Sequence, residues 1–462
     1  MHWITREELL EAIGGTADEL TSGTMPGPIR RVVTDSRVVE AGDLFVALPG
    51  QTRHGGEFLD EAARRGAVAA VVGPGAFRNR YRHRGLACIR VADSLQALWD
   101  LAAWHRDRCS AVRIAVTGSF AKTTTRQMIH HVLSSCGSAV QSPLNYNNHV
   151  GLPLSLLSMK PDDRFGVFEV AASGRGEIGP LSELVQPSVG VLTGLGRAHL
   201  GGFGTFESVV REKSRLLESV EEGGLVVVPV DCRERIPGTG ELQEWVTVGV
   251  ETEADIVARG VEHDSGELRF EVDGCRFCLQ VAGRHFVSSA LSAIAVARGL
   301  GVSDEQTARL LSTFLTASGR CRVQQTERGT VIDDSYNASP ESMLAACRVL
   351  SEWSAAGRRV LVLGDMAELG EHAAACHGEL GAAVASGGGI DRLWAAGSWA
   401  DSTVSAAVDA GMPVESTWSG ESVEQLLESL PGLLESGDTV LVKGAREARM
   451  ERVVKQFCQV EH

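Results

Sequence analysis

The segment from Ile114 to Thr125 constrains the fold of this chain more than any other. It reads Ile-Ala-Val-Thr-Gly-Ser-Phe-Ala-Lys-Thr-Thr-Thr, so a β-branched strand ends in a tight bend that delivers a lysine to the start of a helix. Such a bend aims backbone N–H groups and a helix dipole at an anion, while the lysine reaches phosphate and a threonine hydroxyl joins a magnesium shell. The nucleotide is expected to contact Gly118, Ser119, Ala121, Lys122, Thr123 and Thr124.

Ala121 is a departure from this pattern, because such loops normally carry glycine directly before the lysine. Glycine accepts a positive φ readily, whereas an L-residue there costs on the order of 1 kcal/mol. We expect this methyl group to weaken nucleotide affinity without abolishing it.

Strands alternate with helices along the chain, which indicates an α/β protein with mostly parallel sheets. A chain of 462 residues is too long for one core, and we expect domains at 1–96, 97–316 and 317–462. The expected strands are 31–34, 43–47, 67–72, 113–117, 165–170, 188–193, 225–229, 330–334, 359–364, 392–395 and 439–443. Helices are expected at 95–108, 123–135 and 288–300, with a β-rich insertion at 254–282.

Polar residues follow several of the central strands. Glu169 ends a strand and could complete a magnesium site with Thr123, since magnesium prefers hard oxygen ligands; a surface or helix-start role is the alternative. Glu177 is a weaker candidate of the same kind. His199 follows a Gly-rich strand end and suits a second metal, the orientation of phosphate or a structural role. Lys213 lies in a helix, where a lone lysine is usually solvated.

The last third of the chain repeats this arrangement at three strand ends: Asp333-Asp334-Ser335-Tyr336-Asn337, Gly364-Asp365-Met366-Ala367-Glu368 and Lys443-Gly444-Ala445-Arg446. They indicate either one binding face or a set of helix caps.

Composition excludes some functions. The net charge of −15 argues against nucleic acid and anionic membranes as partners. No run of about 18 apolar residues suggests a membrane span, and no basic and apolar leader opens the sequence. The ten cysteines are scattered, and the pair Cys275 and Cys278 is interpreted as ordinary thiols. We expect a monomeric cytoplasmic protein with reduced cysteines.

Several motifs together resemble those of the Mur ligases of bacterial cell-wall synthesis, over nearly the whole chain. They are 117–125, Asn-Tyr-Asn-Asn-His-Val-Gly-Leu-Pro at 145–153, 196–204, 333–340, 364–370 and 442–446, with 35–37 and 42–48 near the N-terminus. The resemblance implies three domains: a small N-terminal α/β domain for a UDP-substrate, a central P-loop ATPase-like domain and a C-terminal Rossmann-like domain. It also implies an ATP-dependent ligase that joins a carboxylate to an amine through an acyl phosphate. The expected reaction adds D-alanyl-D-alanine to UDP-N-acetylmuramoyl-tripeptide.

The resemblance also assigns roles to individual residues. It implies catalytic roles for Lys122, His199, Lys213 and Asp334. Magnesium would be held by Thr123, Glu169, His199 and Lys213, the last as a carbamate, which turns a cation into an oxygen donor. Further ATP contacts would come from His285, Ser289, Arg320 and Asn337. Substrate contacts would come from Ser36, Arg37, Asn147, Asn148, Tyr336 and Lys443.

The sequence departs from the family pattern at residues that shape the pocket: His54, Gly56, Phe120, Ala121, Ala171, Ser173, Gly194, Phe286, Ser289 and Ala445. The charged and metal-binding positions are kept. This pattern favours a working ligase, with a paralogue that forms an amide in another pathway as the alternative. The alternative from a different functional class is a non-catalytic binding protein with the same fold.

Overall fold

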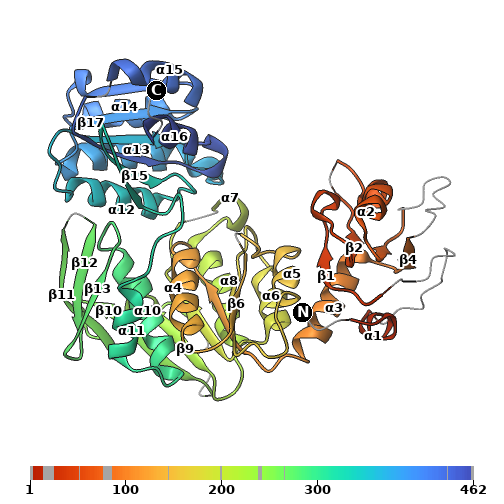
Figure 1. Cartoon of the computed structure of the whole chain (residues 1–462). Coiled ribbons are helices and arrows are strands. Elements are labelled where there is room, and N and C mark those ends of the chain that lie inside the picture. The colour runs from red at the N-terminus through yellow and green to blue at the C-terminus, as the bar shows by residue number, and fades with distance from the viewer. Residues whose placement is uncertain are drawn as a thin grey trace.

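The computed structural model describes residues 4–13, 25, 27–50, 52–75, 86–143, 145–197, 200–237, 242–264, 266–433 and 435–458. The described residues form three sheets, each covered by helices (Figure 1). The C-terminal sheet lies above the central one in that view, and the N-terminal sheet stands to one side. The expected α/β class with three units is therefore confirmed, while the exact domain boundaries remain predictions.

The N-terminal sheet has four parallel strands in the order β1-β2-β3-β4. They are β1 (Arg31–Val33), β2 (Asp43–Ala47), β3 (Ala69–Val72) and β4 (Ala87–Arg90). The helices of this part are α1 (Arg6–Ala12) and α2 (Leu59–Arg65), with 3-10 turns η1 (Ser36–Val38) and η2 (Gly55–Phe58).

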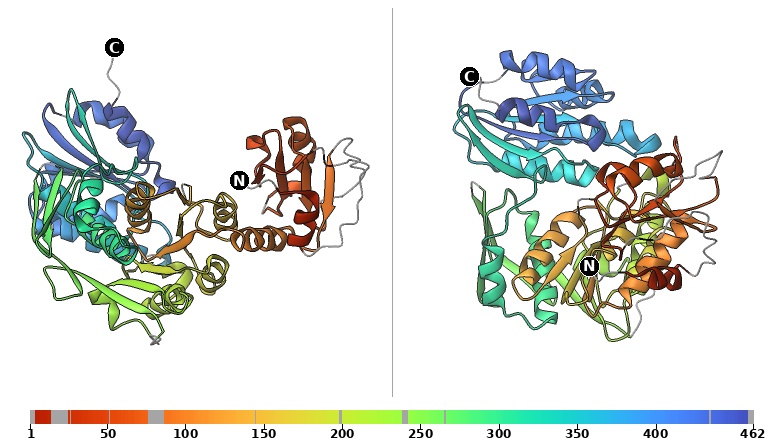
Figure 2. Two further views of the ribbon diagram at one scale, coloured as in Figure 1. Left: turned by 60° about the horizontal axis from the view of Figure 1, so that its bottom comes forward. Right: turned by 45° about the vertical axis from the view of Figure 1, so that its right-hand side comes forward.

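Helix α3 (Ser94–Arg106) links the first two parts. Asp93 caps it by accepting hydrogen bonds from the backbone of Leu95 and Gln96. The helix packs on α1, β2 and β3 on one side and on α5 and α6 of the central part on the other. The expected boundary at 96/97 falls inside this helix, which is seen as an orange rod between the two parts (Figure 2).

The central sheet has nine strands in the order β13-β12-β11-β10-β9-β8-β5-β7-β6, and only β12 runs antiparallel to the others. The strands are β5 (Val112–Thr117), β6 (Ala139–Gln141), β7 (Phe165–Glu169), β8 (Val189–Leu192), β9 (Leu225–Pro229), β10 (Glu244–Val250), β11 (Ile256–Asp264), β12 (Glu267–Val272) and β13 (Cys275–Leu279). The helices are α4 (Lys122–Ser134), α5 (Gly151–Leu156), α6 (Ile178–Val185), α7 (Leu200–Phe203), α8 (Phe206–Glu218), α9 (Val230–Arg233), α10 (Phe286–Gly299) and α11 (Asp304–Leu311).

Helices cover both faces of this sheet because its central strands are apolar on both sides. In β5, Ile114 and Val116 pack with Met128 of α4, while Ala115 between them faces the opposite core with Leu181 of α6. The strand carrying the loop is thus held rigidly from two sides.

The C-terminal sheet has six strands in the order β14-β15-β19-β16-β17-β18, parallel except for β14. The strands are β14 (Arg322–Thr326), β15 (Gly329–Asp334), β16 (Arg359–Gly364), β17 (Arg392–Ala396), β18 (Thr417–Gly420) and β19 (Asp438–Lys443). The helices are α12 (Pro340–Ser351), α13 (Ala373–Gly387), α14 (Ala400–Asp409), α15 (Val423–Leu433) and α16 (Glu451–Cys458), with 3-10 turns η3 (Gly370–His372), η4 (Val414–Ser416) and η5 (Arg446–Ala448).

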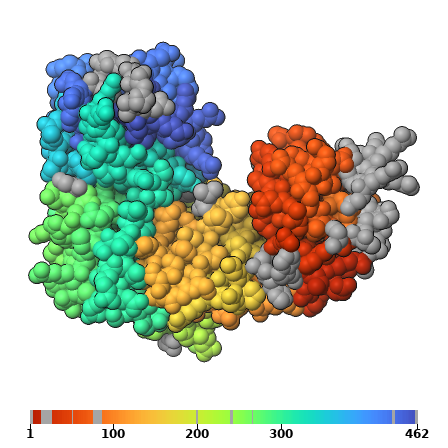
Figure 3. Space-filling model, viewed as in Figure 1, coloured from red at the N-terminus to blue at the C-terminus, as the bar shows by residue number. Residues whose placement is uncertain are grey.

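The central and C-terminal parts are in direct contact. One cluster of buried apolar side chains runs from α4 and α10 into α12 and β16 of the C-terminal part. Polar bonds add to it: the backbone N–H of Arg197 donates to Glu341 at 2.8 Å, and that of Gly201 donates to the Glu368 carbonyl at 3.1 Å. The surface view shows the C-terminal and N-terminal parts rising from the central part with a hollow between them (Figure 3). Over the residues that the structure describes, no helix combines the length and apolarity that a membrane crossing requires.

Candidate active site

The bend between β5 and α4 has the expected form. Its first residues are tied to the segment after β8, since the Ser119 N–H donates to the Gly194 carbonyl at 2.9 Å and the Ser119 hydroxyl donates to the Gly196 carbonyl at 3.1 Å. A Cβ atom on Gly118 would lie 2.1 Å from the Thr193 hydroxyl oxygen, so the close approach requires glycine. The Lys122 ammonium curls back and donates to the Gly118 carbonyl at 2.8 Å.

Ala121 adopts the left-handed conformation, with φ 60° and ψ 0°. Such loops use glycine for this conformation, because it is strained for any residue with a Cβ atom. Ala121 adopts it nevertheless, so the bend is kept at the cost of backbone strain. The bend keeps its form with alanine at this position, and the expected loss of nucleotide affinity stays a prediction.

Glu169, at the end of β7, is surrounded by donors. Its Oε2 atom accepts from the Thr123 hydroxyl at 2.9 Å, and its Oε1 atom accepts from the Asn147 amide at 2.8 Å. The buried guanidinium of Arg126 lies 3.6 Å from Oε2. From the C-terminal part, Arg320 donates to the Thr123 hydroxyl at 3.2 Å. Thr123 and Glu169 therefore present adjacent hard oxygen atoms beside the loop.

This donor set fits magnesium bound together with phosphate. Within the described ranges, no group of three or more His, Cys, Asp or Glu side chains gathers as a metal cluster. Magnesium commonly takes only one or two carboxylates from the protein and completes its shell with phosphate oxygens and water. Thr123 and Glu169 suit that mode, and His199, the predicted ligand of a second metal, lies outside the described residues.

Lys213 on α8 is 1% exposed, and its ammonium nitrogen has no hydrogen-bond partner among the residues that the structure describes. It lies 5.4 Å from the ring centre of Phe203. Burial, reinforced by the charge of Lys122, lowers the pKa of Lys213 to about 7. The solvated surface lysine expected from its helix alone is therefore wrong, and the role that the resemblance implies for Lys213 stays a prediction.

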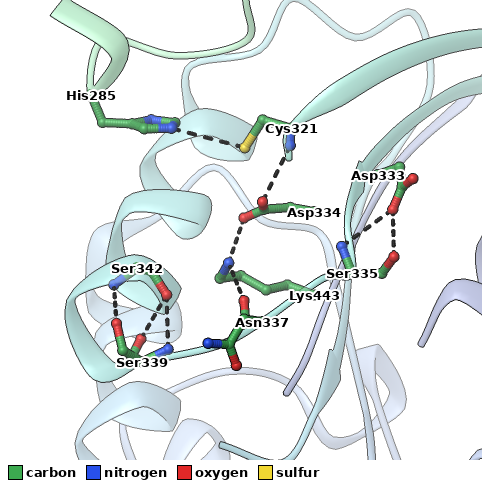
Figure 4. A network of polar contacts seen from close by, with 9 residues as sticks. All are labelled: His285, Cys321, Asp333, Asp334, Ser335, Asn337, Ser339, Ser342 and Lys443. Atoms are coloured by element: carbon green, nitrogen blue, oxygen red, sulfur yellow. Dashed lines mark hydrogen bonds and ion pairs between the residues drawn. The ribbon is translucent and has the colours of Figure 1, made fainter. Parts of the chain in front are cut away.

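The C-terminal wall is built from a buried polar network (Figure 4). Lys443 is 3% exposed and pairs with Asp334 at 2.6 Å, while it also donates to the Asn337 carbonyl at 2.9 Å. The Cys321 N–H donates to Asp334 at 3.2 Å, and the Cys321 sulfur lies 4.0 Å from the His285 ring. Lys443 and Asp334 thus satisfy each other, which leaves little of either charge for a ligand.

Two further predicted nucleotide contacts lie on or near α10. Burial lowers the pKa of His285 to about 4, so this ring is neutral at physiological pH. The ring centres of His285 and Phe286 are 4.4 Å apart. Ser289 accepts from the Thr125 hydroxyl at 2.9 Å and so ties α10 to α4.

A cavity of about 550 Å³ lies between the central and C-terminal parts, in front of the loop. It brings together most of the predicted site residues: Ser119, Ala121, Lys122, Thr123, Thr124, Asn147, Asn148, Glu169, His285, Ser289, Arg320, Asp334, Tyr336, Asn337 and Lys443. Gly118 and Lys213 are not in its lining.

The two predicted contacts in the N-terminal part lie away from this cavity. The Ser36 hydroxyl donates to Glu61 at 2.7 Å, and Arg37 pairs with Asp35 at 2.7 Å. Neither residue lines the cavity.

Sequence reasoning missed Arg126, Thr193 and Glu341. Arg126 lies one helical turn beyond Thr123, so its place on the same face of α4 could have been found from helical spacing. Thr193, which lines the cavity, was seen only as the end of a strand. Glu341 could not have been found, because its contact with Arg197 joins two distant parts of the chain.

Known families match nearly the whole chain. Residues 28–103 match the model described as Mur ligase family, catalytic domain; residues 116–297 match the Mur ligase middle domain; and residues 319–446 match the Mur ligase, glutamate ligase domain. The chain is 32% identical over 450 residues to the UDP-N-acetylmuramoyl-tripeptide–D-alanyl-D-alanine ligase of Bacillus subtilis, covering 96% of this chain and 97% of the relative. The Escherichia coli enzyme of the same name is 32% identical over 434 residues, with 92% of each chain covered.

Solved structures agree with these relatives. A crystal structure of MurF from Acinetobacter baumannii superposes with a TM-score of 0.87 at 29% identity, covering 99% of both chains. MurF from Thermotoga maritima in complex with ADP gives a TM-score of 0.79 at 28% identity, covering 93% of this chain and 97% of the other. Similarity of this extent across all three parts leaves one assignment: the chain belongs to the Mur ligase family.

Proposed function

We propose that this protein is an ATP-dependent ligase that adds D-alanyl-D-alanine to UDP-N-acetylmuramoyl-tripeptide in peptidoglycan synthesis. The relatives that match over almost their whole length carry this activity in their names. The observation that carries the proposal is the cavity, in which a phosphate-type loop, Glu169 and the polar C-terminal wall face one another.

In the proposed reaction, the loop N–H groups and Lys122 bind the triphosphate. The acceptor carboxylate attacks the γ-phosphorus atom, an acyl phosphate forms, and ADP is the leaving group. Lys122 now donates to Gly118 and would turn to the phosphoryl oxygens, where its charge stabilises the negative charge that builds up during transfer. The amine then attacks the acyl carbon and phosphate leaves, which forms the amide bond.

Thr123 and Glu169 would hold magnesium, whose charge neutralises the phosphate oxygens when it is bound. The carboxylate of Glu169 is also held by Asn147 and Arg126. These contacts orient the carboxylate toward Thr123. His199 remains a proposed ligand of a second metal.

We extend the proposal to carbamylation of Lys213. A neutral amine is the form that reacts with CO₂: a bond forms between its nitrogen and the CO₂ carbon, and the nitrogen releases a proton. The low pKa of Lys213 supplies that neutral amine near pH 7. The carbamate would add an anionic oxygen donor near the loop. It would form on the Lys213 nitrogen, which has no hydrogen-bond partner among the described residues.

The other residues are assigned roles in binding ATP or the acceptor according to the part of the molecule in which they lie. Arg320, whose guanidinium lies 4.2 Å from the ring centre of Tyr336, would contact ATP across the cavity, together with Asn337. Closure of the C-terminal part against the loop would exclude water from the acyl phosphate. Ser36 and Arg37 would bind the UDP end of the acceptor, with Asn147 and Asn148 nearer the reacting end. Domains at 1–96, 97–316 and 317–462, a monomeric state and a cytoplasmic location stay part of the proposal.

A paralogue that forms an amide in another pathway is the second candidate. It is favoured by the apolar residues Phe120, Ala121 and Phe286 in the cavity lining, where the family usually has Asn or Gly. A changed lining would alter substrate choice before it altered the phosphoryl chemistry.

Incubation with UDP-N-acetylmuramoyl-tripeptide, D-alanyl-D-alanine and MgATP tests the proposal. Mass spectrometry should find the pentapeptide product, with one ADP formed for each amide bond. Phosphate release no greater than in a control without the dipeptide would reject the cell-wall reaction in favour of the paralogue. Absence of magnesium-dependent ATP binding in calorimetry would reject both ligase readings.

A further inference from the structure

Four basic side chains other than histidine line the cavity: Lys122, Arg320, Lys443 and Arg446. Three of them are engaged inside the protein, Lys122 with the Gly118 carbonyl, Arg320 with the Thr123 hydroxyl and Lys443 with Asp334. Arg446 differs, because its side chain is exposed and its guanidinium has no hydrogen bond or ion pair with any residue that the structure describes.

The backbone that carries Arg446 is held in place. Arg446 opens η5, which is separated from the end of β19 by Gly444 and Ala445, and Ala445 donates its backbone N–H to the Asp365 carbonyl at 2.8 Å. This bond ties the segment to the end of the neighbouring strand β16. The backbone is thus held at the cavity while the long side chain remains free to reach a ligand.

The chemistry of the proposed reaction leaves one anionic group without a partner. Lys122 and the loop N–H groups serve the triphosphate and the transferring phosphoryl group, and Arg320 lies beside Thr123 on that same side. The incoming dipeptide must attack as a neutral amine, so its ammonium charge cannot anchor it in the reactive state. Its terminal carboxylate is therefore the charged group by which the protein can hold it.

We propose that Arg446 binds the carboxylate of the incoming dipeptide. The resemblance had implied a substrate contact at Lys443, without saying which group it binds. The inference rests on the proposed function and adds the residue that selects the amine. A guanidinium accepts a carboxylate through two parallel hydrogen bonds, which also fixes its orientation. Lys443 is unsuited to the task because Asp334, at 2.6 Å, already neutralises it in a buried pair. Glu447 lines the same cavity but forms no ion pair with Arg446 among the described contacts.

The test compares D-alanyl-D-alanine with its C-terminal amide, which lacks the negative charge. Hydrogen bonds to charged groups contribute enough that the unmodified protein should lose about 10- to 100-fold in kcat/KM for the amide. Arg446→Gln should lose a similar factor with the dipeptide and show no further loss with the amide. Arg446→Lys should recover part of the discrimination. The KM values for ATP and for the UDP-tripeptide should not change.

Arg348→Gln is the matched control, since Arg348 is exposed on α12 and does not line the cavity. It should discriminate between dipeptide and amide as the unmodified protein does. Equal use of both amines by the unmodified protein, or full discrimination in Arg446→Gln, would overturn the inference. If the unmodified protein ligates neither amine, the proposed function fails. The role of Arg446 is then decided by NMR line broadening of the two dipeptides in the presence of MgADP, with preference for the free acid expected only while Arg446 is present.

Discussion

Lys213 should carry CO₂ at neutral pH, and the structure sets the size of the effect. An ordinary lysine has a pKa of 10.5, whereas burial and the nearby charge of Lys122 lower that of Lys213 to about 7. Burial disfavours the charged ammonium, so the neutral form appears at lower pH. At pH 7, about half of Lys213 is then neutral, roughly a thousandfold more than for a lysine in water.

The assay removes CO₂ from the protein and then returns ¹³C-labelled bicarbonate at several pH values, with dissolved CO₂ held constant. The carbamate carbonyl signal in the NMR spectrum should grow between pH 6 and pH 8, and its initial rate of growth, which follows the neutral fraction of Lys213, should have a midpoint near pH 7. Ligase activity should fall on CO₂ removal and return with the signal. Lys213→Ala should give neither, although short carboxylates should restore part of its activity.

Lys160→Ala is the control, because Lys160 is exposed and should not form a stable carbamate. It should keep the signal and the activity of the unmodified protein. A labelled signal of equal strength in Lys213→Ala would refute the assignment, and so would a signal that appears only above pH 9.

Three further predictions concern the loop and the contact between the two parts that form the cavity. Lys122→Met should lower kcat by a factor of about 10² or more, because the donor that stabilises the transferring phosphoryl group is lost; steady-state kinetics with turnover near that of the unmodified protein would contradict this role. Ala121→Gly should raise the free energy of unfolding by about 0.5 kcal/mol, since relief of the left-handed strain exceeds the added chain entropy. Urea denaturation measures this change, and a lower midpoint at an unchanged slope would argue against strain at Ala121. Arg197→Ala removes the side-chain ion pairs of Arg197 with Glu341 and Glu379 and should increase the radius of gyration in small-angle scattering; an unchanged profile would show that these pairs do not hold the two parts together.

Much of the fold could be predicted because its strands are short apolar runs between turn signals. The expected strands at 43–47, 225–229 and 359–364 match β2, β9 and β16 to the residue, and Cys275 and Cys278 lie in strand β13 as free thiols. The missed strands lie mostly at sheet edges or toward the insertion, where polar residues interrupt the apolar pattern. β10, for example, begins Glu-Trp-Val-Thr and is only partly buried in that half. Such strands form because a neighbour offers hydrogen bonds, which local sequence does not reveal.

The candidate site also contains residues that the sequence could predict and residues that it could not. The loop residues are neighbours in the sequence, so their common role could be inferred from spacing alone. The burial of Lys213 and the pairing of Lys443 with Asp334 depend on packing between distant segments. From the sequence, Lys443 beside Gly444 at a strand end is interpreted as a ligand contact. Only the fold shows that Asp334, on the adjacent strand, forms an ion pair with it.

The continuous helix α3 has a consequence for the kind of molecule that this protein can accept. Thirteen residues of α-helix extend about 20 Å, and the helix packs against both the N-terminal and the central part of the chain. Ser36 and Arg37 belong to the N-terminal part and do not line the cavity in front of the loop. Any single compound that contacts both the cavity and these two residues must be elongated. The spacing between the N-terminal and central parts would therefore select substrates by length. Truncated acceptors would bind at one end and leave the other empty.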